Sequence, residues 1–245
     1  MVYTYDGSFP GFLSAVYTIY HDGTSHVDDI RRSSGEGELF FEEKEVPTNF
    51  DEAQKVASAF LDACGRVASQ WLFRAFLYDD PKGDMELFHF LREGFRLKKK
   101  IYGKRLEPWA WNVFKRASAT GDEAGTFLGL VRFSELAGGT LYSEIRPTHD
   151  ILPLLANHFR RRLGNEEWAI HDIGRRHVLY GHEGMILFAQ MTSQDTIEYS
   201  GEEESFRRLW RGYYQHMAIR ERYNPALRRS FMPEKYWECL TEMKP

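Results

Sequence analysis

The sequence predicts an α+β fold with a mainly helical first half, an antiparallel sheet in the second half, and a long C-terminal helix that closes the chain. Apolar residues recur at spacings of three and four through much of residues 51–119, as in amphipathic helices. Beyond that point short β-prone runs alternate with turns, in the order strand, strand, helix, strand, strand, strand. We expect one compact α+β unit over residues 1–245, with a subdivision into 1–123 and 124–245 as the alternative.

The first half begins with a short strand and then becomes helical. Alternation at residues 3–5 predicts a strand, and the turn at 6–8 leads into a helix over 10–20 with Pro10 in its first turn. The polar residues 21–38 predict a loop, and 39–41 a brief strand. Further helices are expected from Asn49 or Asp51 to residue 64, then over 66–78, from 84 into the lysines near 98, and over 109–119.

The second half changes from helical to strand periodicity. Strands are expected over 126–133 and 140–145, joined by a turn that contains Gly138 and Gly139. Thr148 or Asp150 is expected to cap a helix over 151–163, and strands follow over 167–173, 177–181 and 185–191. A long helix over 202–223 should bury one face of Phe206, Leu209 or Trp210, Tyr213 and Met217, and a short helix over 233–240 ends the fold.

The composition indicates a globular protein of the cytoplasm. Hydrophobic residues make up 42% of the chain and charged residues 28%, and no apolar run approaches the length of a membrane span. The first residues lack the features of a secretion signal. Cys64 and Cys239 lie too far apart in sequence to indicate a disulfide framework, a zinc site or an iron–sulfur cluster. We expect no metal and no cofactor.

Basic residues concentrate in two segments of an acidic chain. The net charge is −4, yet residues 91–116 hold 9 bases and 2 acids, and residues 206–235 hold 8 bases and 2 acids. Such segments are typical either of polyanion binding or of solvated helix faces. Aromatic residues 95 and 102 interleave with the first segment, which suits stacking on a base. The expected nucleic-acid-binding residues are Arg96, Lys98, Lys99, Lys100, Lys104, Arg105, Arg175, Arg176, Arg228 and Arg229.

The stretch WAIHDIGRRHVLY at 168–180 raises the question of catalysis. On a strand, His171 and Asp172 point to opposite faces, which argues against a His-Asp dyad. Arg175 and Arg176 fall in the following turn, where they suit phosphate contacts or a salt bridge to Glu166 or Glu167. No nucleophile, phosphate-loop or metal-ligand motif is present. The remaining catalytic candidates are His149, Asp150, His171 and Asp172, provided that they converge.

Four separated blocks of the sequence resemble a bacterial family of DNA metabolism proteins. The blocks are the opening YDGSF with GFL, the run FLGLVRFSELAGGTLYSEIRPTHDILPLLANHFRRRL, the stretch WAIHDIGRR and the ending IRERYNPALRRSFMPEKYW. The resemblance implies association with a neighbouring DNA modification and repair radical SAM protein. Some relatives are fused to a domain similar to uracil-DNA glycosylase. This chain lacks the CxxxCxxC motif of radical SAM enzymes, so the resemblance implies a companion of that enzyme.

Three hypotheses of function remain open at this point. The first is a DNA-associated accessory protein in base repair or modification, which binds DNA, a radical SAM partner, or both. The second is a nucleic-acid-processing enzyme with a His, Asp and Arg site near residues 149–176. The third is a structural adaptor whose acidic N-terminal region, with 11 acids against 4 bases in residues 1–60, docks a basic partner.

Overall fold

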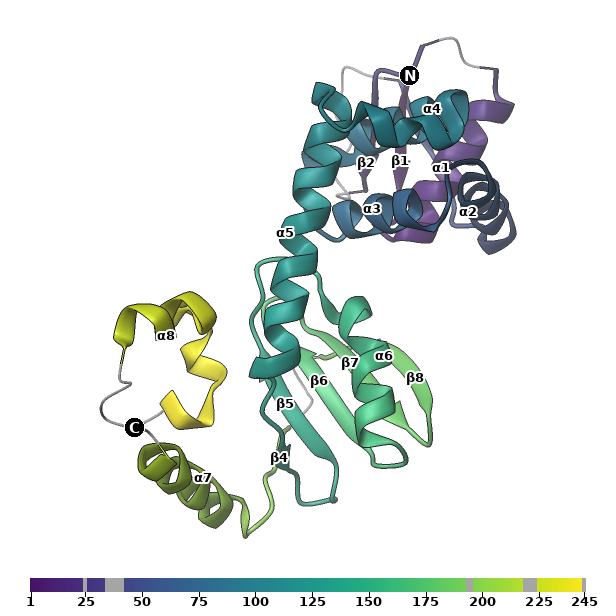
Figure 1. Ribbon diagram of the computed structural model, residues 1–245. Coiled ribbons are helices and arrows are strands. Elements are labelled where there is room, and N and C mark those ends of the chain that lie inside the picture. The colour runs from purple at the N-terminus through teal and green to yellow at the C-terminus, as the bar shows by residue number, and fades with distance from the viewer. Residues whose placement is uncertain (24–25, 34–41, 193–195, 218–223, 244–245) are drawn as a thin grey trace. The chain divides into compact units, whose positions relative to one another are not determined.

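The computed structural model describes residues 1–23, 26–33, 42–192, 196–217 and 224–243, which fall into two units, 1–120 and 121–245 (Figure 1). The first unit is built on a small parallel sheet of order β2-β1-β3. Strand β1 (Val2–Tyr5) lies between β2 (Asp29–Arg32) and β3 (Glu43–Glu45). Val2, Tyr3 and Tyr5 are almost fully buried, so β1 forms the centre of this core.

Helices make up the rest of the first unit. They are α1 (Phe9–His21), α2 (Phe50–Cys64), α3 (Arg66–Phe76), α4 (Asp84–Leu97) and the first part of α5 (Pro108–Leu130), with short 3-10 helices η1 (Pro81–Gly83) and η2 (Lys98–Lys104). Ser8 caps α1 by accepting the Gly11 N–H at 3.0 Å, and the Asn49 side chain caps α2. The predicted helices at 10–20, 51–64, 66–78 and 84–97 are therefore confirmed.

Two predictions in the first unit fail or fall outside the described residues. Strand β2 lies within residues 21–38, which were expected to be loop throughout. The charged sequence DIRR does not show the apolar pattern of a buried strand, and within β2 only Ile30 is fully buried. The brief strand expected at 39–41 lies outside the residues that the structure describes.

Helix α5 is much longer than expected. The strand predicted over 126–133 is wrong, because residues up to Leu130 continue the helix. Buried residues Val113, Ala117, Thr120, Ala124 and Phe127 recur at four, three, four and three, which is the stripe of a single helix. Burial of this stripe outweighs the strand preference of the run TFLGL.

The second unit holds a five-stranded sheet of order β4-β5-β6-β7-β8, with helix α6 (Leu152–Leu163) packed against it (Figure 1). The strands are β4 (Ser134–Glu135), β5 (Leu141–Ile145), β6 (Trp168–Asp172), β7 (His177–His182) and β8 (Met185–Gln190). The sheet is mostly antiparallel, but β5 and β6 run parallel because α6 connects them as a crossover. The predicted purely antiparallel sheet therefore needs this correction.

The core of the second unit lies between one face of the sheet and α6. Ile145, Ile170 and Leu179 project from adjacent strands toward Leu155 and Phe159 of α6. The predicted cap of α6 is wrong: the helix begins after Ile151 with no side-chain cap, and Pro153 occupies its first turn.

The C-terminal part contains short helices in place of one long closing helix. Helix α7 (Glu203–Met217) and helix α8 (Pro225–Phe231) are followed by 3-10 helices η4 (Glu234–Cys239) and η5 (Thr241–Met243). Asn224 caps α8 by accepting the Leu227 N–H, and Pro225 takes its first position, so a new helix starts there. Among the described helices none is long and apolar enough to cross a membrane.

Candidate nucleic-acid interface

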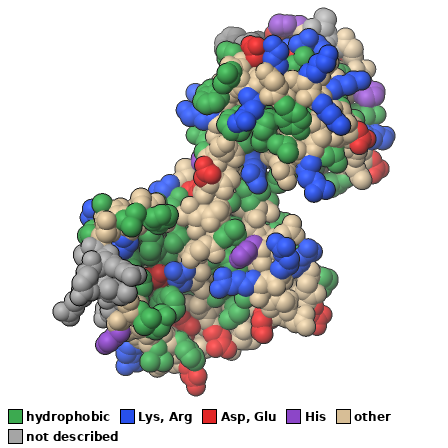
Figure 2. Space-filling view, in the orientation of Figure 1, with side chains coloured by type: hydrophobic (Ala, Val, Ile, Leu, Met, Phe, Trp, Pro, Cys, Tyr) green, Lys and Arg blue, Asp and Glu red, His purple; other side chains and the backbone are tan. Residues whose placement is uncertain are grey.

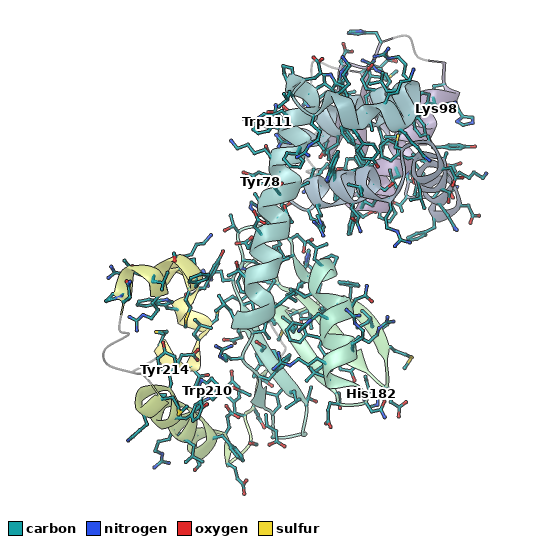
Figure 3. All side chains as sticks on the ribbon, viewed as in Figure 1. Tyr78, Lys98, Trp111, His182, Trp210 and Tyr214 are labelled. Atoms are coloured by element: carbon teal, nitrogen blue, oxygen red, sulfur yellow. The ribbon has the colours of Figure 1, made fainter. Side chains whose placement is uncertain are left out.

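The lysines of the first basic segment lie on a turn that follows α4, which we call the lysine turn (residues 98–104). Helix α4 ends because Lys98 adopts a φ of 52°, an uncommon value for a residue other than glycine. Ile101 is buried, and the Tyr102 hydroxyl donates to the Cys64 carbonyl at 2.7 Å. These two anchors hold the turn against α2 and leave its lysines exposed (Figure 3, where Lys98 is labelled).

The six cations predicted here differ in how they are engaged. Arg96 pairs with Glu93, Lys104 pairs with Glu107 at 3.1 Å, and the Arg105 guanidinium lies 3.9 Å from the ring centre of Phe114. Lys98, Lys99 and Lys100 form no ion pair with any residue that the structure describes. They line an open groove of about 950 Å³ together with Ala59, Asp62 and Ala63 of α2. Three of the six ammonium or guanidinium groups are therefore available to an anion.

The aromatic residues of this segment take part in the fold. Phe95 packs edge-on against Phe60 and Tyr20, with ring centres 5.6 and 6.2 Å apart. Tyr102 packs against Trp71 and bonds to Cys64. Base stacking at the lysine turn would need these rings to leave their partners, so the turn itself suits contacts to phosphate better than contacts to bases.

Strand β6 separates His171 from Asp172, as the strand pleat predicts. Asp172 is fully buried and accepts the Gly174 and Arg175 backbone N–H groups at 3.0 and 3.2 Å. The Arg175 guanidinium donates to Asp172 at 3.0 Å and to the Thr148 carbonyl at 2.7 Å. Arg175 therefore joins the turn after β6 to the loop before α6, and its ionic partner is Asp172, where the sequence had suggested Glu166 or Glu167. Arg176, with a φ of 58°, is exposed.

His171 occupies the other face of the sheet and pairs with Tyr142. The Tyr142 hydroxyl lies 2.6 Å from His171 Nδ1, and both side chains are more than nine-tenths buried. Burial lowers the pKa of His171, although the nearby Glu144 and Asp172 carboxylates oppose the shift. Burial and the charge of Glu144 raise the pKa of Tyr142. Both groups are therefore neutral at pH 7, and the pair is a buried hydrogen bond on the face of the sheet that α6 does not cover.

His149 and Asp150 lie in the loop before α6. The Glu123 carboxylate accepts the Thr148 and His149 backbone N–H groups at 2.9 and 2.8 Å. Since Arg175 donates to the carbonyls of Pro147 and Thr148, the structure joins this loop to the turn after β6. His171 belongs to the opposite face, so the four catalytic candidates do not share one face of the sheet.

Arg228 and Arg229 lie on α8. The Arg228 guanidinium stacks 5.1 Å from the ring centre of Trp237, and Arg229 pairs with Glu234 at 2.7 Å. Arg228 therefore takes part in the packing of the C-terminal turns, whereas Arg229 lies in an exposed ion pair.

Two features of the second unit escaped the sequence predictions. The residues of α7 that were expected in the core are exposed: Phe206, Leu209, Tyr213 and Met217 by more than half, and Trp210 by 39%. Arg160, Arg161 and Arg162 in the last turn of α6 are also exposed, and none forms an ion pair among the described residues. The run RRR beside an aromatic helix is the signal that would have revealed them.

Comparison with known proteins identifies a domain and no characterised relative. A model of the domain of unknown function DUF4130 matches residues 81–242, which include the lysine turn and almost all of the second unit. No curated protein and no solved structure matches the chain.

Proposed function

The chain belongs to the family of the DUF4130 domain of unknown function, and we propose that it is a DNA-associated accessory protein that binds the phosphate backbone through its lysine turn. The observation that carries this proposal is the exposure of Lys98, Lys99 and Lys100 without carboxylate partners among the described residues. A protein with a net charge of −4 binds a polyanion only through a local cationic surface, and this turn provides one.

The chemistry of the turn favours sequence-independent contacts. Lysine ammonium groups act as flexible point charges, which neutralise phosphates and release counterions without reading base edges. Affinity should therefore fall steeply with salt. Removal of three phosphate contacts should reduce the slope of log K against log salt by roughly two to three.

The second part of the proposal is that the protein acts together with a radical SAM enzyme. Its support is the resemblance of four sequence blocks to bacterial DNA metabolism proteins, which also makes a uracil-DNA glycosylase-like protein a partner to test. The accessory role agrees with the separation of His171 from Asp172 on β6, since that geometry offers no ready catalytic dyad. Co-expression with the neighbouring radical SAM protein, followed by co-purification, tests this part.

Fluorescence anisotropy with a labelled DNA duplex tests the lysine turn. The variant Lys98→Gln, Lys99→Gln, Lys100→Gln should bind at least about tenfold more weakly at low salt, with the smaller salt slope given above. The matched control replaces Lys55, Lys82 and Lys115, three exposed lysines of the same unit, with glutamine. Equal losses of affinity in both variants would show that binding depends on net charge alone. Unchanged affinity in the Lys98, Lys99 and Lys100 variant would show that the lysine turn does not bind DNA.

A further inference from the structure

Helix α7 presents an apolar stripe that the described residues of its unit leave largely exposed. Phe206, Leu209, Trp210, Tyr213 and Met217 follow one another at three, one, three and four, which places them on one face of the helix. Their exposed fractions are 53, 69, 39, 57 and 63%. A stripe with this spacing is normally the buried face of a helix, so its exposure calls for a ligand or partner.

The helix is attached to its unit through a polar flank. Glu203 accepts the Glu135 backbone N–H at 2.9 Å and pairs with Arg207 at 2.7 Å, and Arg207 also donates to Ser134 at 3.0 Å. Trp210 donates its indole N–H to Glu242 at 2.9 Å. These contacts fix the orientation of α7 and hold Trp210 (labelled in Figure 3), while the other four side chains of the stripe stay more than half exposed.

The stripe forms one wall of a groove of about 540 Å³, which we call the α7 groove. Val131 and Phe133 line it from the segment after α5, and Arg162 lines it from the last turn of α6. Phe206, Leu209, Trp210 and Tyr213 supply the α7 side. In Figure 2 apolar and basic side chains lie next to one another on the visible face of the second unit.

The cations at this groove differ in their availability. Arg132 is held by Glu242 at 2.7 Å, and Arg207 by Glu203. Arg162 has no ion pair with a described residue. Arg160 and Arg161, which precede it in the same turn, donate to Asn157 and form no ion pair within the described part of the chain. Arg162 thus lines the same groove as Phe206, Trp210 and Tyr213, and Arg160 and Arg161 precede it in the last turn of α6.

Aromatic rings next to an arginine that forms no ion pair with a described residue suit a ligand that has planar rings and negative charge. Trp210 and Tyr213 stack with ring centres 5.8 Å apart and planes 27° apart, and the Arg132 guanidinium lies 5.6 Å from the centre of the Trp210 ring. Single-stranded nucleic acid has the complementary chemistry, since its bases stack on such rings while its phosphates bind arginine. We propose that the α7 groove binds single-stranded nucleic acid, with bases on Trp210 and Tyr213 and the backbone toward Arg160, Arg161 and Arg162.

This inference rests on the proposed function for the kind of ligand, but it concerns a different unit and different residues. The lysine turn contacts phosphates alone, whereas the α7 groove contacts bases as well. The two surfaces therefore have separate signatures. Loss of lysines reduces the salt slope, whereas loss of aromatic rings weakens binding at every salt concentration.

The test measures anisotropy of a fluorescein-labelled thymidine oligonucleotide of about 12 nucleotides with the full-length protein. The double variant Trp210→Ala, Tyr213→Ala should bind at least about tenfold more weakly, and Tyr213→Phe, which keeps the ring, should bind as the wild type does. Trp111→Ala is the matched control, because Trp111 is an exposed tryptophan of α5 in the first unit. Replacement of Arg160, Arg161 and Arg162 by glutamine should weaken binding and reduce the salt slope. Circular dichroism confirms that each variant is folded.

The outcomes separate the two proposals. Unchanged oligonucleotide affinity in the Trp210 and Tyr213 variant overturns the proposed binding at the α7 groove, even if the lysine variant still loses affinity for duplex DNA. Loss of co-purification with the radical SAM protein in that variant, with oligonucleotide affinity intact, assigns the groove to a protein partner and also overturns the inference. Absence of binding by the wild type to both duplex and oligonucleotide at low salt removes both proposals.

Discussion

Arg175→Gln should destabilise the second unit and leave duplex binding unchanged. The Arg175 guanidinium bonds to the buried Asp172 carboxylate and to the carbonyl of Thr148, with a longer bond to Pro147. Its removal leaves Asp172, which is 0% exposed, with two backbone N–H groups as its donors among the described residues. An unpaired buried charge costs about 3–5 kcal/mol, and the remaining backbone bonds reduce this to about 2–4 kcal/mol.

Differential scanning calorimetry of the full-length protein measures this loss. For a unit of this size, about 3 kcal/mol corresponds to a decrease in Tm of roughly 10 °C. The neighbouring Arg176→Gln is the matched control, because Arg176 is exposed, and it should change stability by no more than about 0.5 kcal/mol. A double-mutant cycle with Asp172→Asn should give a coupling energy of about 1–2 kcal/mol.

The opposite pattern would refute this interpretation of Arg175. If Arg175→Gln kept its Tm but lost duplex affinity with a smaller salt slope, the guanidinium would be a phosphate contact, as the sequence suggested. A coupling energy near zero with Asp172 would likewise show that the ion pair contributes nothing to stability.

Three further substitutions probe the packing described above. Glu123→Gln should destabilise the protein at pH 7, because hydrogen bonds from Tyr236 and the 148–149 backbone outweigh burial and lower the pKa of Glu123 below its ordinary 4.5. Urea unfolding should show that the difference in stability between wild type and variant shrinks as the pH falls below 4.5, where the carboxylate becomes protonated in both the folded and the unfolded state. Gly181→Ala should cost about 1–3 kcal/mol in the same assay, since a Cβ there would lie 2.2 Å from the Trp168 ring, and an unchanged midpoint would contradict that contact. Lys98→Gly should raise stability by about 0.5–2 kcal/mol, because relief of the strain at the positive φ that ends α4 exceeds the extra unfolded-state entropy of glycine, and a fall would show that the lysine side chain contributes to the turn.

Local patterns predict the helices of the first unit well. Ala53, Val56, Phe60 and Cys64 recur at helical spacing and are buried, so α2 can be recognised from sequence alone. The end of α5 cannot be recognised in this way. Phe127 is held in the helix by a contact with Tyr236, which is distant in sequence and whose ring centre lies 4.6 Å away. The parallel pairing of β5 and β6 is also non-local, since it depends on the path of α6.

The candidate site shows the same limit. The exposure of the lysine turn follows from its charge density, and the opposite orientation of His171 and Asp172 follows from the strand pleat. The structural role of Arg175 does not follow from the sequence, because its hydrogen-bond partners include the carbonyl of Thr148 in another loop. The exposed stripe of α7 was expected in the core because hydrophobic periodicity identifies an apolar face without showing what covers it.

The order of the strands in the second unit also has a kinetic consequence. Strands β6, β7 and β8 follow one another through tight turns, so their pairing closes only short loops. The pairing of β5 with β6 closes a longer loop that contains all of α6, and it brings Ile145 and Ile170 into one hydrophobic core. We therefore expect the three-stranded meander to form early and the β4–β5 hairpin to join it only when α6 docks. The crossover helix that makes this sheet mixed would then also set its rate of folding.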